Sequence, residues 1–134
     1  MAEIFEKLNL KDQQEILVLH TPESFQPELA RLPVLNIHHH IESVPRIEFF
    51  LGFVTRRSEV DALSGPVAAR AVGDAVVWFA YPKGTSKKYT CDFNRDNGWD
   101  ALKSQGFDTV RAVAIDEDWT ALRFRRVEFI RGRR

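Results

Sequence analysis

The stretch WFAYPKGTSKKY, residues 78–89, holds the residue types best suited to binding an anion. An apolar run ends at Pro82 and is followed by Lys83, a glycine, two hydroxyl side chains and the pair Lys87 and Lys88. A P-loop needs G-x-x-x-x-G-K-[ST], because glycine amides must surround the phosphates with a lysine directly after them. The stretch has one glycine in a different place, so it is no P-loop, but a loop after a strand can still bind a ligand.

Other polar side chains follow apolar runs that we predict to be strands. Thr21 follows the run 15–20, and Arg56 and Arg57 follow the run 46–54. In open α/β sheets, ligands bind outside the carboxyl ends of the strands. We therefore expect an anion-binding crevice formed by Lys83, Arg56, Arg57, Lys87 and Lys88, with Asp116 and Trp119 beside it. In the competing interpretation the lysines are solvated turn residues, Asp116–Asp118 is a solvated turn, and Trp119 packs beneath it.

His38 and His40 share one face of a predicted strand and could bind a metal together. Only His20 or Glu42 is a convenient third ligand, and no diagnostic spacing is present, so we predict no metal site and keep this pair as the alternative. Cys91 lies between aromatic residues and outside any known nucleophile signature, so we predict a core or half-buried thiol. We therefore assign no catalytic residue.

Composition bounds the possible partners. The chain has 19 basic and 19 acidic residues, so its formal net charge gives no support for a membrane or nucleic-acid role. One cysteine fits a reducing compartment, no signal peptide is evident, and no apolar run could span a membrane, so we expect a cytoplasmic protein. The basic segment 123–134 is interpreted as an edge strand and tail, with an anion-binding arm as the alternative. A nucleic-acid accessory role would require binding that falls steeply with salt.

Apolar runs alternate with helical patterns along the chain. This order predicts a single α/β domain over residues 1–134, with a mainly parallel sheet that ends in an antiparallel hairpin. The short connections between residues 34 and 54 leave open an antiparallel pairing of the second and third strands. The last strand changes its buried face, so we expect a bulge or strand end near Arg125-Arg126. The predicted strands are 15–20, 34–41, 46–54, 74–81, 109–116 and 119–130.

Three helices are expected between these strands. The first carries Phe25, Leu29 and Leu32 at helical spacing, with Pro27 in its first turn. The second begins at Ser58, with Asp61 completing a capping box, and is kinked or split at Gly65-Pro66. The third runs from an Asn94 cap through Trp99 and Leu102 to about Gln105 and ends at Gly106.

From about Glu15 to Phe129, the segments LHTPESF, FFLGFVTRRSEVDAL, VVWFAYPKGTSKK and AVAIDEDWTALRF resemble a bacterial family of small proteins of unknown function. The element order is also similar to the C-terminal half of class I methyltransferases. The resemblance implies a Rossmann-like, truncated methyltransferase-like fold with helices on both faces of the sheet. Those enzymes hold S-adenosylmethionine at a glycine-rich turn after the first strand and by a carboxylate of the second strand. Here the turn reads LHTPES, and the second strand offers only Glu42, so we expect no S-adenosylmethionine and no other cofactor.

The sequence thus predicts a non-catalytic domain that binds a small anionic ligand or a protein partner. A homodimer is expected through the edge that the final antiparallel strand should expose. The alternative is an enzyme, a minimal or degenerate group-transfer catalyst of methyltransferase-like type with an unidentified substrate.

Overall fold

The structure is a computed structural model that describes residues 3–32 and 36–130. Its sheet has six strands in the order β2-β1-β3-β4-β6-β5, and β6 runs antiparallel to both β4 and β5 while the β1, β2, β3 and β4 pairings are parallel. This Rossmann-like arrangement confirms the predicted parallel sheet with its closing hairpin. The strands are β1 (Glu15–Leu19), β2 (Asn36–His38), β3 (Ile47–Phe53), β4 (Ala71–Pro82), β5 (Phe107–Ala114) and β6 (Trp119–Arg126).

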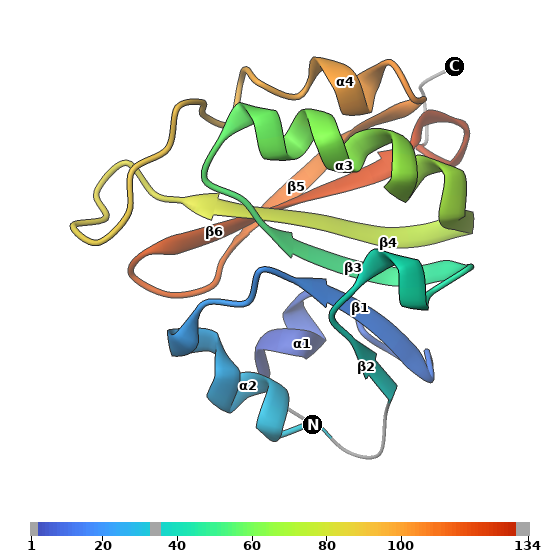
Figure 1. Ribbon diagram of the computed structural model, residues 1–134, viewed down its shortest axis with the longest axis horizontal. Coiled ribbons are helices and arrows are strands. Elements are labelled where there is room, and N and C mark those ends of the chain that lie inside the picture. The colour runs from blue at the N-terminus through green and yellow to red at the C-terminus, as the bar shows by residue number, and fades with distance from the viewer. Residues whose placement is uncertain (1–2, 33–35, 131–134) are drawn as a thin grey trace.

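Helices cover both faces of the sheet (Figure 1). The helices α3 (Arg57–Arg70) and α4 (Asp100–Lys103) pack on one face, and α1 (Glu3–Lys7) and α2 (Gln26–Ala30) pack on the other. Since the central parallel strands are covered on both sides, residues 75–82 of β4 are all buried, as a continuous apolar run predicts. No helix within the described residues is long and apolar enough to cross a membrane.

Aromatic side chains fill the two cores. On the α3 side, Trp99 packs against Phe79, Phe93 and Phe124 with ring centroids 5.0–5.8 Å apart. On the α1 side, the indole Nε1 of Trp78 donates a hydrogen bond of 2.8 Å to the carbonyl oxygen of Leu8. This bond joins the segment after α1 to the centre of β4, so the amino-terminal segment is part of the core.

The predicted start of the second helix was wrong. The helix α3 begins at Arg57, and Glu59 accepts hydrogen bonds from backbone N–H groups before the helix, instead of the predicted pair of Ser58 and Asp61. The Gly65-Pro66 step does not split it, because α3 is assigned as one helix of 14 residues with Pro66 inside. A proline clashes partly with the Cβ of the preceding residue, and glycine has none.

The third helix is much shorter than predicted. Trp99 is the N-cap residue of α4, while the side chain of Asn94 accepts hydrogen bonds from the backbone N–H groups of Asp96 and Asn97 in a local turn. Asn94 therefore stabilises a loop and caps no helix. Gly106 does follow the helix, with φ of +91°, as predicted.

The bounds and the order of the strands test several predictions made from the sequence. The last strand ends at Arg126, which confirms the expected end near Arg125-Arg126. The second predicted strand is reduced to Asn36–His38, although residues 33–35 lie outside the described part. Because β1 lies between β2 and β3, the antiparallel alternative for those two strands was wrong. The final strand is also not an edge, since β5 lies outside it, and the homodimer stays a prediction.

Candidate functional site

The strand order reverses between β1 and β3, which makes this pair the topological switch point of the sheet. From β1 the chain crosses to β2 on one side, and from β3 it crosses to β4 on the other. Such a reversal separates the crossover connections and leaves a crevice outside the carboxyl ends of the two strands. In Figure 1 the arrowheads of β1, β3 and β4 point to the same edge of the sheet. The segments that begin at His20, Val54 and Lys83 therefore form the candidate site.

The turn after β1 has an unusual backbone. His20 adopts φ of +57°, in the left-handed region that favours glycine, and so turns the chain sharply out of the strand. The next side chain, Thr21, has a buried Oγ1 with no hydrogen-bond partner among the described residues. Buried hydroxyls are normally paired, so this oxygen lacks a partner that a water or a ligand group would supply.

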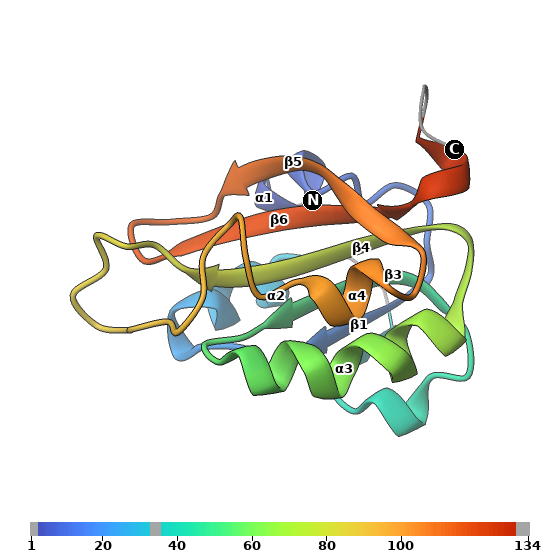
Figure 2. The same cartoon turned by 90° about the horizontal axis from the view of Figure 1, so that it is seen from above.

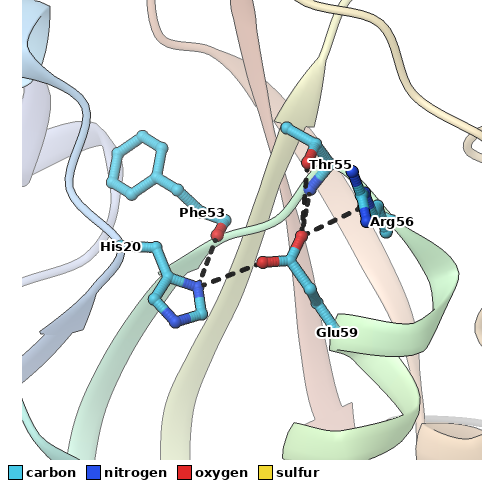
Figure 3. A network of polar contacts seen from close by, with 5 residues as sticks. All are labelled: His20, Phe53, Thr55, Arg56 and Glu59. Atoms are coloured by element: carbon cyan, nitrogen blue, oxygen red, sulfur yellow. Dashed lines mark hydrogen bonds and ion pairs between the residues drawn. The ribbon is translucent and has the colours of Figure 1, made fainter.

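A polar network joins the ends of β1, β3 and α3 (Figure 3). The Nδ1 atom of His20 lies 3.2 Å from the carbonyl oxygen of Phe53 and 3.6 Å from Oε2 of Glu59. A carbonyl oxygen only accepts, so Nδ1 carries the proton and Nε2 of the neutral ring is the acceptor. The side chain of His20 is 52% exposed, so the ring can meet a ligand at the edge.

The other carboxylate oxygen of Glu59 holds the start of α3. Its Oε1 accepts hydrogen bonds from the backbone N–H groups of Thr55 at 2.8 Å and Arg56 at 3.1 Å. The hydroxyl of Thr55 also lies 3.3 Å from the same oxygen. One carboxylate thus satisfies N–H groups before the helix and faces the imidazole, and this fixes the segment that leads from β3 into α3.

The loop of residues 83–99 extends past the end of β4 and returns to α4 (Figure 2). The Oγ of Ser86 donates a 2.8 Å hydrogen bond to Oδ1 of Asp118, and the N–H of Lys83 donates to the Asp118 carbonyl at 2.8 Å. The ring of Tyr89 packs on Trp119 with centroids 4.9 Å apart. These contacts tie the loop to the β5–β6 hairpin.

Three hollows lie beside this loop, and the cationic side chains predicted to form one crevice line different ones. Arg56 and Lys88 share a hollow of about 340 Å³. Lys87 and Lys88 share a second, of about 360 Å³, with Glu117 and Asp118. Lys83 lines a third, of about 280 Å³, with Tyr81, Cys91 and Phe93. The sequence placed these side chains in one crevice, and the structure distributes them around the loop.

The remaining residues of the predicted crevice have structural contacts. The guanidinium of Arg57 lies 3.9 Å from Asp100 of α4 and lines none of the three hollows. Asp116 accepts hydrogen bonds through Oδ1 from the N–H groups of Asp118 and Trp119, which shapes the hairpin turn. Trp119 is buried with its ring edge-on to Phe53, and its Nε1 is a second buried polar atom without a partner among the described residues.

The histidine and cysteine candidates are placed differently. His38 pairs with Glu15 at 2.9 Å, while His40 is exposed and precedes a short 3₁₀ helix. No group of three potential metal ligands occurs in residues 3–32 and 36–130. Cys91 is half-buried, and burial raises the pKa of its thiol, which disfavours the thiolate needed for nucleophilic attack.

Sequence reasoning missed two residues of this edge. Glu59 was overlooked, although its position three residues after Arg56 is the spacing of a capping carboxylate. His20 was considered only as a third metal ligand, because nothing in the sequence signals its left-handed backbone. Thr21 was placed at the correct edge, but the burial of its hydroxyl depends on the folded turn.

Comparison with solved structures identifies the fold. A SAM-dependent methyltransferase from Aquifex aeolicus shares 13% sequence identity and a TM-score of 0.58, over 93% of this chain and 88% of that one. The phosphoethanolamine N-methyltransferase 2 of Haemonchus contortus, solved with S-adenosylhomocysteine, shares 7% identity and a TM-score of 0.57, over 94% of this chain and 38% of that one. LepI, solved in complex with SAM, shares 10% identity and a TM-score of 0.53, over 91% of this chain and 38% of that one. The likeness therefore extends beyond the C-terminal half of such enzymes.

No protein-family model matches the sequence, and a search of curated proteins found no match. The resemblance to a bacterial family of unknown function therefore stays a prediction.

The expectation of no S-adenosylmethionine, made from the missing glycine-rich turn, was wrong. Two of the structural neighbours reported above are methyltransferases, and two of the three were solved with SAM or its demethylated product bound. The error came from treating glycine as necessary in the turn after β1. His20 adopts the left-handed backbone that glycine would otherwise provide, so the turn forms without it.

Proposed function

We propose that this protein is a methyltransferase-like group-transfer enzyme that binds an S-adenosylmethionine-type cofactor at the β1/β3 switch point. The likeness to SAM-dependent methyltransferases supports the fold-level part of the proposal. The observation that carries the site is the turn after β1, where His20 is left-handed and the buried hydroxyl of Thr21 has no partner among the described residues.

Two buried polar atoms, one in the turn after β1 and one at the start of β6, suit such a cofactor. Thr21 Oγ1 can both donate and accept, so it can pair with a carboxylate, an ammonium or a ribose hydroxyl. Trp119 Nε1, buried at the same edge, can only donate, so it suits an oxygen of the ligand. These two atoms would hold the cofactor, which supplies an electrophilic methyl group when bound.

The histidine at this edge would manage the proton that an acceptor hydroxyl or amine releases. Because Nδ1 donates to the carbonyl of Phe53, Nε2 is the nitrogen able to take up a proton. Glu59 lies 3.6 Å from Nδ1 and stabilises the imidazolium that results. The exposure of the ring leaves Nε2 within reach of a ligand in the crevice.

Calorimetric titration with S-adenosylhomocysteine tests the proposal, since this product binds without turnover. Thr21→Val keeps the shape of the side chain and removes its hydroxyl, so we expect about five- to tenfold weaker binding from the loss of one hydrogen bond. Thr109→Val is the matched control. Thr109 lies on β5, the outermost strand on the far side of the sheet from β1, so this variant should bind like the wild type. Absence of binding to the wild type at millimolar concentration, or equal affinity for all three proteins, would overturn the proposal.

A further inference from the structure

The hollow of about 340 Å³ lies between the start of α3 and the loop that follows β4. Arg56 and Thr55 contribute its α3 side, and Lys88, Tyr89 and Thr90 contribute its loop side, together with Asp92. Its volume is within the range of small-molecule sites. Two cationic side chains and three hydroxyl-bearing ones converge here from segments more than thirty residues apart in the sequence.

The charge of this hollow is positive. Within residues 3–32 and 36–130, neither Arg56 nor Lys88 has a carboxylate at ion-pair distance. Asp92 is the acidic residue of the lining, and its Oδ1 accepts a 2.7 Å hydrogen bond from the backbone N–H of Arg57. This hydrogen bond gives one oxygen of the Asp92 carboxylate a partner and holds it at the start of α3. The two cations therefore remain available to an anion.

The hollow adjoins the proposed cofactor site through one short segment. Thr55 lines the hollow, and its N–H and hydroxyl contact Oε1 of Glu59. The second oxygen of that carboxylate faces the ring of His20. A ligand held by Arg56 would thus lie beside the switch point, with the ring of Tyr89, packed on Trp119, as an apolar wall.

We infer that the acceptor substrate is a small molecule bearing a carboxylate or phosphate, which Arg56 and Lys88 bind in this hollow. This inference rests on the proposed function, because it names the substrate class of the same site. Arg56 supplies a planar fork of donors and Lys88 a point charge, and the hydroxyl of Thr90 can donate to a remaining oxygen of the anion.

The neighbouring cations are less suited to this role. Lys88 lines both the hollow of Arg56 and the one that holds Glu117 and Asp118, whereas Lys87 lines the second and not the first, so an anion beside Lys87 meets two carboxylates. Arg57 faces Asp100 at 3.9 Å and is outside the hollow. These two residues are adjacent in sequence to Lys88 and Arg56, so they provide matched control variants.

The test is an NMR titration of the protein with inorganic phosphate and, separately, with succinate, each with and without S-adenosylhomocysteine. We expect saturable shifts of backbone amides around Thr55 and Thr90. Arg56→Gln and Lys88→Gln should each weaken binding about tenfold, the worth of a charge-assisted hydrogen bond. Arg57→Gln and Lys87→Gln should stay within about twofold of the wild type, because each removes one positive charge outside the anion's contacts.

The outcomes separate this inference from the proposed function. Equal losses in all four variants, or no saturable shifts, would overturn the anion site, since the attraction would then be general. If S-adenosylhomocysteine binds and the anions do not, the inference alone fails. If the anions bind through Arg56 and Lys88 and S-adenosylhomocysteine does not, the proposed function fails and the anion site stands. A preference for phosphate over succinate, or the reverse, identifies which anion the acceptor carries.

Discussion

Replacing His20 by glycine and by alanine tests whether this residue supplies the left-handed turn after β1. Both changes remove the imidazole, and so both lose its hydrogen bond to Phe53 and its contact with Glu59. The two variants differ only in the Cβ atom of alanine. Since φ at this position is +57°, the comparison isolates the cost of a side chain in a left-handed residue.

The size of the difference follows from two opposing terms. A non-glycine residue in the left-handed region costs about 1–2 kcal/mol. Glycine has more freedom in the unfolded chain, which offsets about 0.5–1 kcal/mol of that gain. We therefore expect His20→Gly to be more stable than His20→Ala by about 0.5–1 kcal/mol, or about 2–4 °C in the unfolding midpoint.

Urea and thermal unfolding of both variants measure this difference. Ala62→Gly is the control, because Ala62 is exposed inside α3 and glycine there should destabilise by about 1 kcal/mol. The sign of the glycine effect should therefore reverse between the two positions. Equal stability of the two His20 variants, or a more stable alanine variant, would refute the left-handed turn and remove the reason given for a cofactor site without glycine.

Three further predictions concern the core and the titrating groups. Trp78→Phe leaves the buried carbonyl of Leu8 without its 2.8 Å donor and should cost about 2 kcal/mol in urea unfolding; a loss below about 0.5 kcal/mol would contradict the bond. Burial raises the pKa of the Cys91 thiol, so at pH 8 it should react with iodoacetamide more slowly in native than in unfolded protein. The reaction rate of the native protein should rise with pH. Equal rates for native and unfolded protein would show an exposed thiol. Asp74→Asn removes the negative charge and one of the two oxygens that accept hydrogen bonds of 2.6 and 2.7 Å from Arg125. It should cost about 1 kcal/mol at low salt and less at high salt, since both groups are about one third exposed; a salt-independent effect would exclude an ionic cause.

The parallel sheet could be predicted because its central strands are buried on both faces. The run 74–81 has no polar residue after Asp74, which only a strand covered by helices on both sides tolerates in a protein of this size. The closing hairpin was recognisable from two apolar runs on either side of an acidic turn. These signals are local in sequence, and the packing agrees with them.

The helix starts and the grouping of the cations could not be predicted in the same way. Two capping patterns overlap at the start of α3, and the geometry of the strand end selects Glu59 over Asp61. The course of the loop after β4 depends on contacts such as Ser86 with Asp118, 32 residues apart. Only that folded course decides that Lys88 meets Arg56 while Lys83 lines another hollow.

His20 has two roles at the switch point, and a glycine in its place could fill only the first. A glycine can make the turn, but it has no side chain to reach the end of β3 or the start of α3. His20 makes the turn and also bonds the carbonyl of Phe53 and faces Glu59, so one residue connects β1, β3 and α3 at the crevice. The strain of the left-handed backbone is thus offset by contacts that also orient the ring and fix which nitrogen can take a proton. If His20→Gly keeps the affinity for S-adenosylhomocysteine while its unfolding midpoint stays near that of the wild type, the turn serves the cofactor and the ring serves the acceptor's proton. If the affinity is lost with the ring, the imidazole itself contacts the cofactor, and the proton must leave by another group.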